Sequence, residues 1–123
     1  MIYADYNATT PMRPEATAAM LAVLGAPGNP SSVHRAGRTA RAILEGARRQ
    51  VASFLGALPQ SVTFTSGGTE ANFLALRGVG RSRVLVSAIE HDAVLGAVPE
   101  AVHVPVDADG IIDIKALARL LDA

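Results

Sequence analysis

Two short stretches of this sequence carry residues whose types and spacing could do chemistry. The first is the turn Ser66-Gly67-Gly68-Thr69, which lies between an apolar stretch and a helical one. The first backbone amides of a helix have no partners within it, and the aligned peptide dipoles place partial positive charge there. Gly67 and Gly68 would let the backbone approach a ligand closely and adopt angles closed to other residues, while the hydroxyls of Ser66 and Thr69 could donate hydrogen bonds. We therefore predict a cradle for a phosphate group at this turn.

The competing interpretation of this turn is an ordinary helix cap, in which Ser66 or Gly67 satisfies the unpaired amides. Other phosphate-binding motifs fit the chain poorly. It has no GxxxxGK[ST] sequence, and "GVGRSR" (78–83) lacks the third glycine of GxGxxG and precedes a predicted strand. Residue types alone leave both the cradle and the cap open.

The second stretch is "SAIEHDAV", in which Glu90 and His91 come just after a predicted strand over 83–88. Ligands of open α/β sheets bind outside the carboxyl ends of the strands. The turn at 66–69 also follows a predicted strand, so both features would face one crevice. A histidine there could stack on a ring or transfer a proton. The alternative is a surface or capping histidine.

The surrounding pattern predicts an α/β fold in which helices flank a mainly parallel sheet. The helix after the turn, over 71–76, is apolar nearly all round and is expected to be buried. Pro105 lies within the last predicted strand, which is therefore expected at an edge or with a late start. Strands are predicted at 2–5, 62–65, 83–88 and 103–107, and helices from Pro14, over 40–55 up to a Gly56 cap, over 71–76, over 93–98 and after an Asp113 cap.

Bulk composition fits one ordinary domain with a real core. The 123 residues are 50% hydrophobic, carry no net charge and include no cysteine, which argues against disulfides, thiol chemistry within this stretch, and a nucleic-acid protein. The N-terminus lacks the zones of a signal peptide, so we expect a cytoplasmic protein. One region is basic, with only Glu45 to offset Arg35, Arg38, Arg41, Arg48 and Arg49. We predict that it is a solvated helix face; the alternative is a patch that binds the phosphate backbone of a nucleic acid.

Five stretches, taken together, resemble the cysteine desulfurases in order and spacing over nearly the whole chain. They are "YADYNATTPMRPE", "GNPSSVHRAGRTA", "VTFTSGGTEANFLAL", "SAIEHDAVL" and "VPVDADGIIDIKAL". That family belongs to the class V aminotransferase group of pyridoxal-phosphate enzymes, which have the type I fold. The resemblance implies that residues 1–32 form an N-terminal arm, first helix and active-site loop. Residues 33–123 would begin the large cofactor-binding domain.

The same resemblance implies roles for individual residues. Gly68 and Thr69 match the pair that holds the phosphate of pyridoxal 5′-phosphate. His91 matches a catalytic histidine that stacks on the pyridine ring and takes part in proton transfer. Asn7 matches a residue near the mouth of the substrate site, and the loop 28–34 matches one near the active site and dimer interface. A plain turn residue and a linker are the alternatives for these last two.

A complete enzyme of this kind would be a homodimer that takes sulfur from L-cysteine, releases L-alanine, and passes the sulfur through an enzyme persulfide to an acceptor or scaffold protein for iron–sulfur cluster assembly. No metal, nucleic acid or membrane is implied. The chain has one lysine, Lys115, in a predicted non-catalytic helix. The cofactor-binding lysine and the sulfur-accepting cysteine are therefore expected beyond Ala123, and this stretch alone is expected to be inactive. A truncated non-catalytic chain and another class V enzyme, such as a selenocysteine lyase, are the alternatives.

Overall fold

The computed structural model describes residues 2–122 and divides into two compact units, with the division between Val62 and Thr63. Each unit is described by itself. Within the described residues, every helix falls short of the length and apolar character that crossing a membrane requires.

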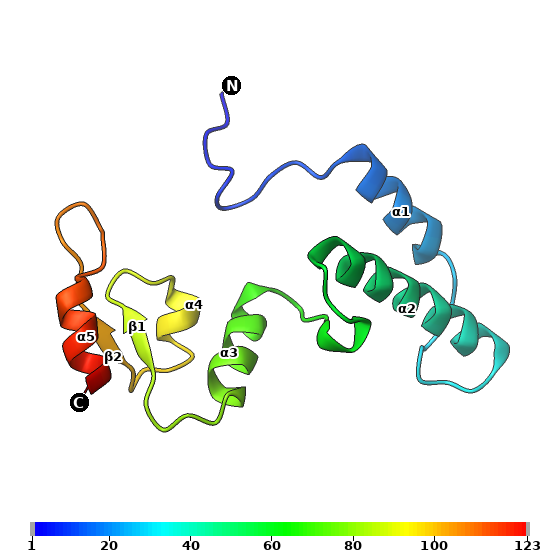
Figure 1. Ribbon diagram of the computed structural model, residues 1–123. Coiled ribbons are helices and arrows are strands. Elements are labelled where there is room, and N and C mark those ends of the chain that lie inside the picture. Colours follow the sequence, from blue (N-terminus) through cyan, green and yellow to red (C-terminus); the bar gives the residue numbers. More distant parts are fainter. Residues whose placement is uncertain (1, 123) are drawn as a thin grey trace. The chain divides into compact units, whose positions relative to one another are not determined.

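The first unit consists of helices. Helix α1 spans Pro14–Leu24, α2 spans Arg35–Leu55, and the 3-10 turn η1 spans Pro59–Ser61 (Figure 1). Proline at the first position of α1 suits a helix start, because its missing N–H would be unpaired there anyway. Helix α2 ends at Gly56, whose φ of 64° and ψ of 27° are left-handed angles that favour glycine. The predicted start at Pro14 and the predicted cap at Gly56 are both confirmed.

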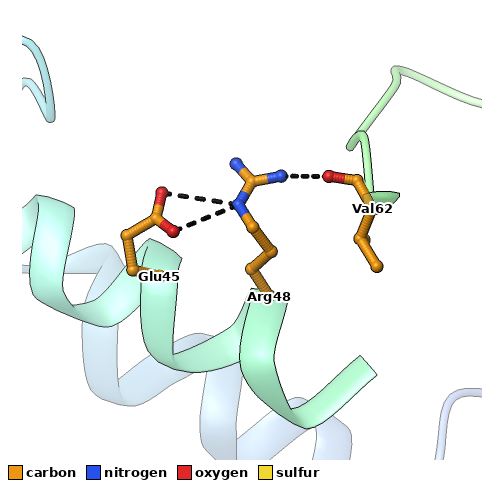
Figure 2. Close-up of polar contacts among 3 residues, drawn as sticks. All are labelled: Glu45, Arg48 and Val62. Atoms are coloured by element: carbon orange, nitrogen blue, oxygen red, sulfur yellow. Dashed lines mark hydrogen bonds and ion pairs between the residues drawn. The ribbon is translucent and has the colours of Figure 1, made fainter. Parts of the chain in front are cut away.

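An arginine ties the end of this unit back to α2. Figure 2 shows Arg48 between the Glu45 carboxylate, 3.2 Å from its Nε, and the Val62 carbonyl, to which its Nη1 donates a hydrogen bond. The turn η1 also packs against α2. The chain therefore leaves the first unit from an anchored position.

The loop before α2 folds tightly onto the start of that helix. The Asn29 side chain accepts a hydrogen bond from the Ser31 amide at 2.9 Å. A Cβ on Gly37 would lie 2.3 Å from the Ser32 carbonyl oxygen, and one on Gly28 would lie 2.8 Å from the Ala36 carbonyl oxygen. These two positions accept only glycine because the neighbouring backbone occupies the space of a side chain.

The second unit contains a two-stranded parallel sheet, β1 (Leu85–Ser87) and β2 (Val102–Val104), with Val86 opposite His103. Helix α3 (Gly68–Gly78) packs against α4 (Asp92–Leu95), and α5 (Ile114–Asp122) packs against β2 (Figure 1). The buried core of this unit is small and apolar, and consists of Val86, Ala97, Val98, Val104 and Ala116.

Two predictions for the second unit are confirmed. The strands pair in parallel, and the Asp113 side chain caps α5 by accepting hydrogen bonds from the amides of Lys115 and Ala116. The bounds predicted for the last strand, 103–107 with a late start, are wrong, because β2 begins at Val102 and ends before Pro105. The segment 107–113 forms a turn, in which Gly110 has a φ of 79°.

Two further predictions are wrong. Neither 2–5 nor 62–65 is a strand, because neither segment finds a pairing strand among the described residues. The helix after the turn is not buried either, since Phe73 and Leu74 are 52% and 48% exposed. A sheet of two short strands has too little surface to cover that helix on all sides.

Candidate functional site

The turn that opens α3 leaves its backbone open. The N-cap residue is Gly67, and no side chain caps the helix. Gly67 has a φ of 167° and a ψ of −176°, which is extended backbone that any residue adopts, and Gly68 has no positive φ. The prediction that these glycines adopt angles closed to other residues is therefore wrong. A Cβ on either one would meet no atom within 4 Å. The glycines leave free space beside the first amides of α3, rather than relieving strain.

The Ser66 side chain neither caps α3 nor points a free hydroxyl at a ligand. Its hydroxyl donates a hydrogen bond to Glu70 Oε2 at 2.7 Å, and its amide donates to the same oxygen at 2.6 Å. The amide hydrogen bond, followed by the hydroxyl, lowers the pKa of Glu70 below its usual 4.5. The expectation that Ser66 supplies a free donor is corrected, because that donor is taken by the carboxylate.

Thr69 keeps its donor. Its hydroxyl makes no hydrogen bond within residues 2–122, and it lies in the first turn of α3 beside the uncapped amides. The cap interpretation of the turn therefore lacks a capping side chain. Free amides and a free hydroxyl at a helix N-terminus are a donor set suited to a phosphate.

Glu70 is a residue that the sequence analysis passed over. The signal for it is the spacing Ser66-x-x-x-Glu70, which lies one residue outside the capping box S/T-x-x-E. In that box the acid at the third helical position reaches back to the N-cap amide. Here the acid at that position, Glu70, accepts instead from the amide of Ser66, the residue before the N-cap Gly67.

His91 is the N-cap of α4. Its Nδ1 accepts a hydrogen bond from the Ala93 amide at 3.0 Å. A ring nitrogen that accepts a hydrogen bond carries no proton, so the neutral ring holds its proton on Nε2. The capping interpretation is confirmed, and it leaves the second nitrogen of this exposed ring free to donate. Capping and ligand contact therefore use different atoms of His91.

The turn and His91 belong to the same unit. Helix α3 packs against α4, which His91 caps (Figure 1). A hollow of 460 Å³ lies beside these two helices; its walls include Asn72 and Glu90 but none of Gly68, Thr69 and His91. Among residues 2–122, His91 follows strand β1 but the turn 66–69 follows no strand, so the expectation that the turn lies at a strand end is wrong. That both features face one crevice stays a prediction.

The remaining predicted residues lie elsewhere. Asn7 lies exposed in a turn of the first unit, where the Tyr3 hydroxyl donates to the carbonyls of Asp5 and Thr9, each at 3.0 Å. The loop 28–34 is also in that unit, and its last residue, His34, caps α2. Roles for Asn7 and the loop in binding stay predictions. Lys115 lies exposed in the first turn of α5.

Comparison with known proteins gives a consistent result. The profile of the aminotransferase class-V family matches residues 2–123. A cysteine desulfurase from Frankia sp. is 43% identical over 98% of this chain and 34% of its own length, and an IscS-like cysteine desulfurase from Mycobacterium tuberculosis is 42% identical over 100% and 36%. A selenocysteine lyase from Bos taurus is 44% identical over 89% of this chain and 27% of its own length.

A solved structure agrees with these sequences. The NifS-like protein from Rickettsia africae superimposes with a TM-score of 0.84 at 35% identity, over 99% of this chain and 36% of that one. The predicted resemblance and the predicted α/β fold are confirmed. The chain spans about a third of the length of the curated relatives it matches.

Proposed function

Because this chain belongs to the aminotransferase class-V family, we propose that it forms the N-terminal part of a cysteine desulfurase that depends on pyridoxal 5′-phosphate. The observation that carries the proposal is the match to cysteine desulfurases over nearly the whole chain. The open turn at the start of α3 supports it independently.

The residues at this turn fit the phosphate end of the cofactor. Gly67 and Gly68 leave room within 4 Å of where a Cβ would be, and no side chain competes for the first amides of α3. In the proposed site the amides of Gly68 and Thr69 and the Thr69 hydroxyl donate hydrogen bonds to the phosphate oxygens. When bound, the cofactor supplies the electron sink for bond cleavage at an amino acid substrate.

His91 is proposed to cover one face of the pyridine ring. Its hydrogen bond from the Ala93 amide fixes the ring orientation and keeps the proton on Nε2. That atom can then donate a hydrogen bond to a substrate atom in the site, and it can release a proton when the ring has first taken up a second one, because loss of the proton then restores the neutral ring. Asn7 is proposed to contact the substrate at the mouth of the site.

The proposed reaction takes sulfur from L-cysteine, gives L-alanine, and leaves the sulfur as a persulfide on an enzyme cysteine. A sulfur acceptor or scaffold protein would then receive it, as in iron–sulfur cluster assembly. The proposal places the working enzyme in the cytoplasm as a homodimer. It also requires a lysine and a cysteine from outside these 123 residues, because the chain has no cysteine and its one lysine lies on α5.

A second candidate is a selenocysteine lyase, since the bovine enzyme of that name is 44% identical to this chain. The two activities differ in whether the site accepts sulfur as well as selenium at the substrate side chain. A non-catalytic chain is the third candidate, and it predicts neither activity.

The decisive experiment uses the purified enzyme that contains this chain together with the segment that provides the lysine and the cysteine. It supplies pyridoxal 5′-phosphate and L-cysteine, or L-selenocysteine, and measures L-alanine. A desulfurase forms alanine from both or from cysteine, whereas a strict lyase forms it from selenocysteine alone. Thr69→Ala should weaken the affinity for the cofactor about tenfold, and Thr69→Ser should retain most of it. Absence of alanine from either substrate, with equal affinity for pyridoxal and its phosphate, would overturn the proposal.

A further inference from the structure

We propose that Glu70 is a positioning residue that holds the turn 66–69 in the shape that presents the α3 amides to a phosphate. The inference rests on the proposed function, because it assigns a role at the same turn. It concerns a residue that neither carries a free donor nor needs to touch the cofactor.

The contacts of Glu70 are concentrated on one residue. Its Oε2 accepts both donors of Ser66, the amide at 2.6 Å and the hydroxyl at 2.7 Å. Ser66, the residue that leads into Gly67, is therefore held through two of its atoms at once. The Thr65 hydroxyl adds a further local tie by donating to the Gly67 carbonyl at 3.0 Å.

Within residues 2–122, hydrogen bonds rather than packing restrain the two glycines: the Gly67 carbonyl accepts from the Thr65 hydroxyl and, at 3.1 Å, from the Ala71 amide, and Gly68 begins α3. No atom lies within 4 Å of a Cβ built on Gly67 or Gly68, so side-chain packing does not hold them. Glycine also has more backbone freedom to lose than any other residue. The free space that would admit a phosphate therefore also leaves the backbone of the two glycines without support from packing. The Glu70 carboxylate offsets this by holding Ser66, the residue before Gly67.

The negative charge of Glu70 distinguishes positioning of the turn from direct binding of the phosphate. A carboxylate in the first turn of a helix interacts favourably with the helix dipole, but it repels a nearby phosphate. If Glu70 served the phosphate through its charge, it would have the wrong sign. Its contribution must therefore come from geometry, and a neutral residue that keeps the acceptor oxygen should serve as well.

The experiment titrates the purified, cofactor-free protein with pyridoxal 5′-phosphate and, separately, with pyridoxal, which lacks the phosphate. The ratio of the two dissociation constants isolates the phosphate site from general damage to the protein, which would weaken both ligands. We expect Glu70→Ala to reduce this ratio about tenfold. Glu70→Gln should keep it within about twofold, because its amide oxygen can still accept from Ser66.

Two further variants sharpen the test. Ser66→Ala removes the hydroxyl but keeps the amide hydrogen bond, and should reduce the ratio about threefold. Glu100→Ala is the matched control, because it removes an exposed carboxylate that pairs with Arg77 in the last turn of α3; it should leave the ratio unchanged.

The outcomes separate this inference from the function on which it rests. If the unmodified protein binds pyridoxal and its phosphate equally, the proposed phosphate site fails. If it prefers the phosphate and Glu70→Ala keeps that preference, the site stands and the role of Glu70 is overturned. Loss of the preference in Glu70→Gln as well would show that charge, rather than position, is the operative property, and would overturn the inference too.

Discussion

Helices α2 and α3 both begin after a loop that contains glycine and hydroxyl residues, but their first turns are completed in different ways. The start of α2 is closed by the chain itself, since His34 Nδ1 accepts a hydrogen bond from the Gly37 amide at 3.3 Å. The start of α3 has no capping side chain. At α2 a first-turn amide therefore finds an acceptor within the protein, whereas at α3 the first-turn amides stay available to a ligand.

The glycines at the two sites show the same contrast. Gly28 and Gly37 stand where the neighbouring backbone would collide with a Cβ, whereas Gly67 and Gly68 have nothing near that position. Glycine is required by the fold in the first case and not in the second. The space beside Gly67 and Gly68 is therefore available to a ligand, as the proposed phosphate site requires.

The largest effect should come from filling the space at α2. Gly37→Ala places a Cβ 2.3 Å from the Ser32 carbonyl oxygen and 2.8 Å from that of Asn29, both backbone atoms that move only with the loop. We expect the free energy of unfolding to fall by about 3 kcal/mol, measured by urea denaturation of the purified protein.

Gly46→Ala is the control for that measurement, because it lies within α2 and its nearest atom is an Arg49 nitrogen 3.9 Å away. It should stabilise the protein by about 0.5 to 1 kcal/mol through helix propensity. Equal effects of the two variants would break the distinction between required and unrequired glycines.

The opposite pattern is expected at α3. Gly67→Ala adds a Cβ that meets no atom, at backbone angles open to any residue, so stability should change by less than about 0.5 kcal/mol. The methyl group would occupy space that the proposed phosphate needs. We expect the preference for pyridoxal 5′-phosphate over pyridoxal to fall about tenfold. A variant that unfolds easily, or that keeps the full preference, would contradict the comparison.

Removing the cap of α2 should have a moderate effect. His34→Ala takes away the acceptor for the Gly37 amide, and loss of such a cap costs about 1 kcal/mol. His34→Asn, which offers a side-chain oxygen, should restore most of the loss. The readout is the midpoint of urea unfolding, and failure of asparagine to rescue would show that the imidazole acts through packing instead.

The contrast between the two helix starts was only partly predictable from sequence. The end of α2 at Gly56 and the Asp113 cap depend on residues close in sequence, and both were predicted correctly. The segment 62–65 has the composition of a strand, yet a strand also needs a partner, which local composition does not reveal. The apolar pattern of α3 likewise predicts a preference for burial, but not whether enough surface exists to cover Phe73.

At the candidate site the limit was geometric. Gly68, Thr69 and His91 were identifiable because glycines, hydroxyls and a histidine after a strand are recognisable types. The engagement of Ser66 by Glu70 was not, because the acid accepts from the residue before the N-cap and not from the N-cap amide that is its usual partner. Whether two side chains on either side of glycines meet depends on the backbone angles of those glycines, which the amino-acid sequence does not determine.

The smallest expected effect concerns the pH dependence of the tie between Glu70 and Ser66. Hydrogen bonds from Ser66 lower the pKa of Glu70 in the folded protein below the usual 4.5. Its ionised form is therefore favoured by folding, so its contribution to stability is present above pH 4.5 and is lost as the pH falls through the lowered folded value.

In Glu70→Gln this position does not titrate. We expect the midpoint of thermal unfolding of the unmodified protein to fall relative to that of the glutamine variant once the pH drops below 4.5. Glu100, whose pKa is also lowered, is present in both proteins and cancels. A difference between the two midpoints that stays constant from neutral to acid pH would mean that Ser66 does not bind the ionised carboxylate, and the turn before α3 would then lack the restraint that distinguishes it from a loose glycine loop.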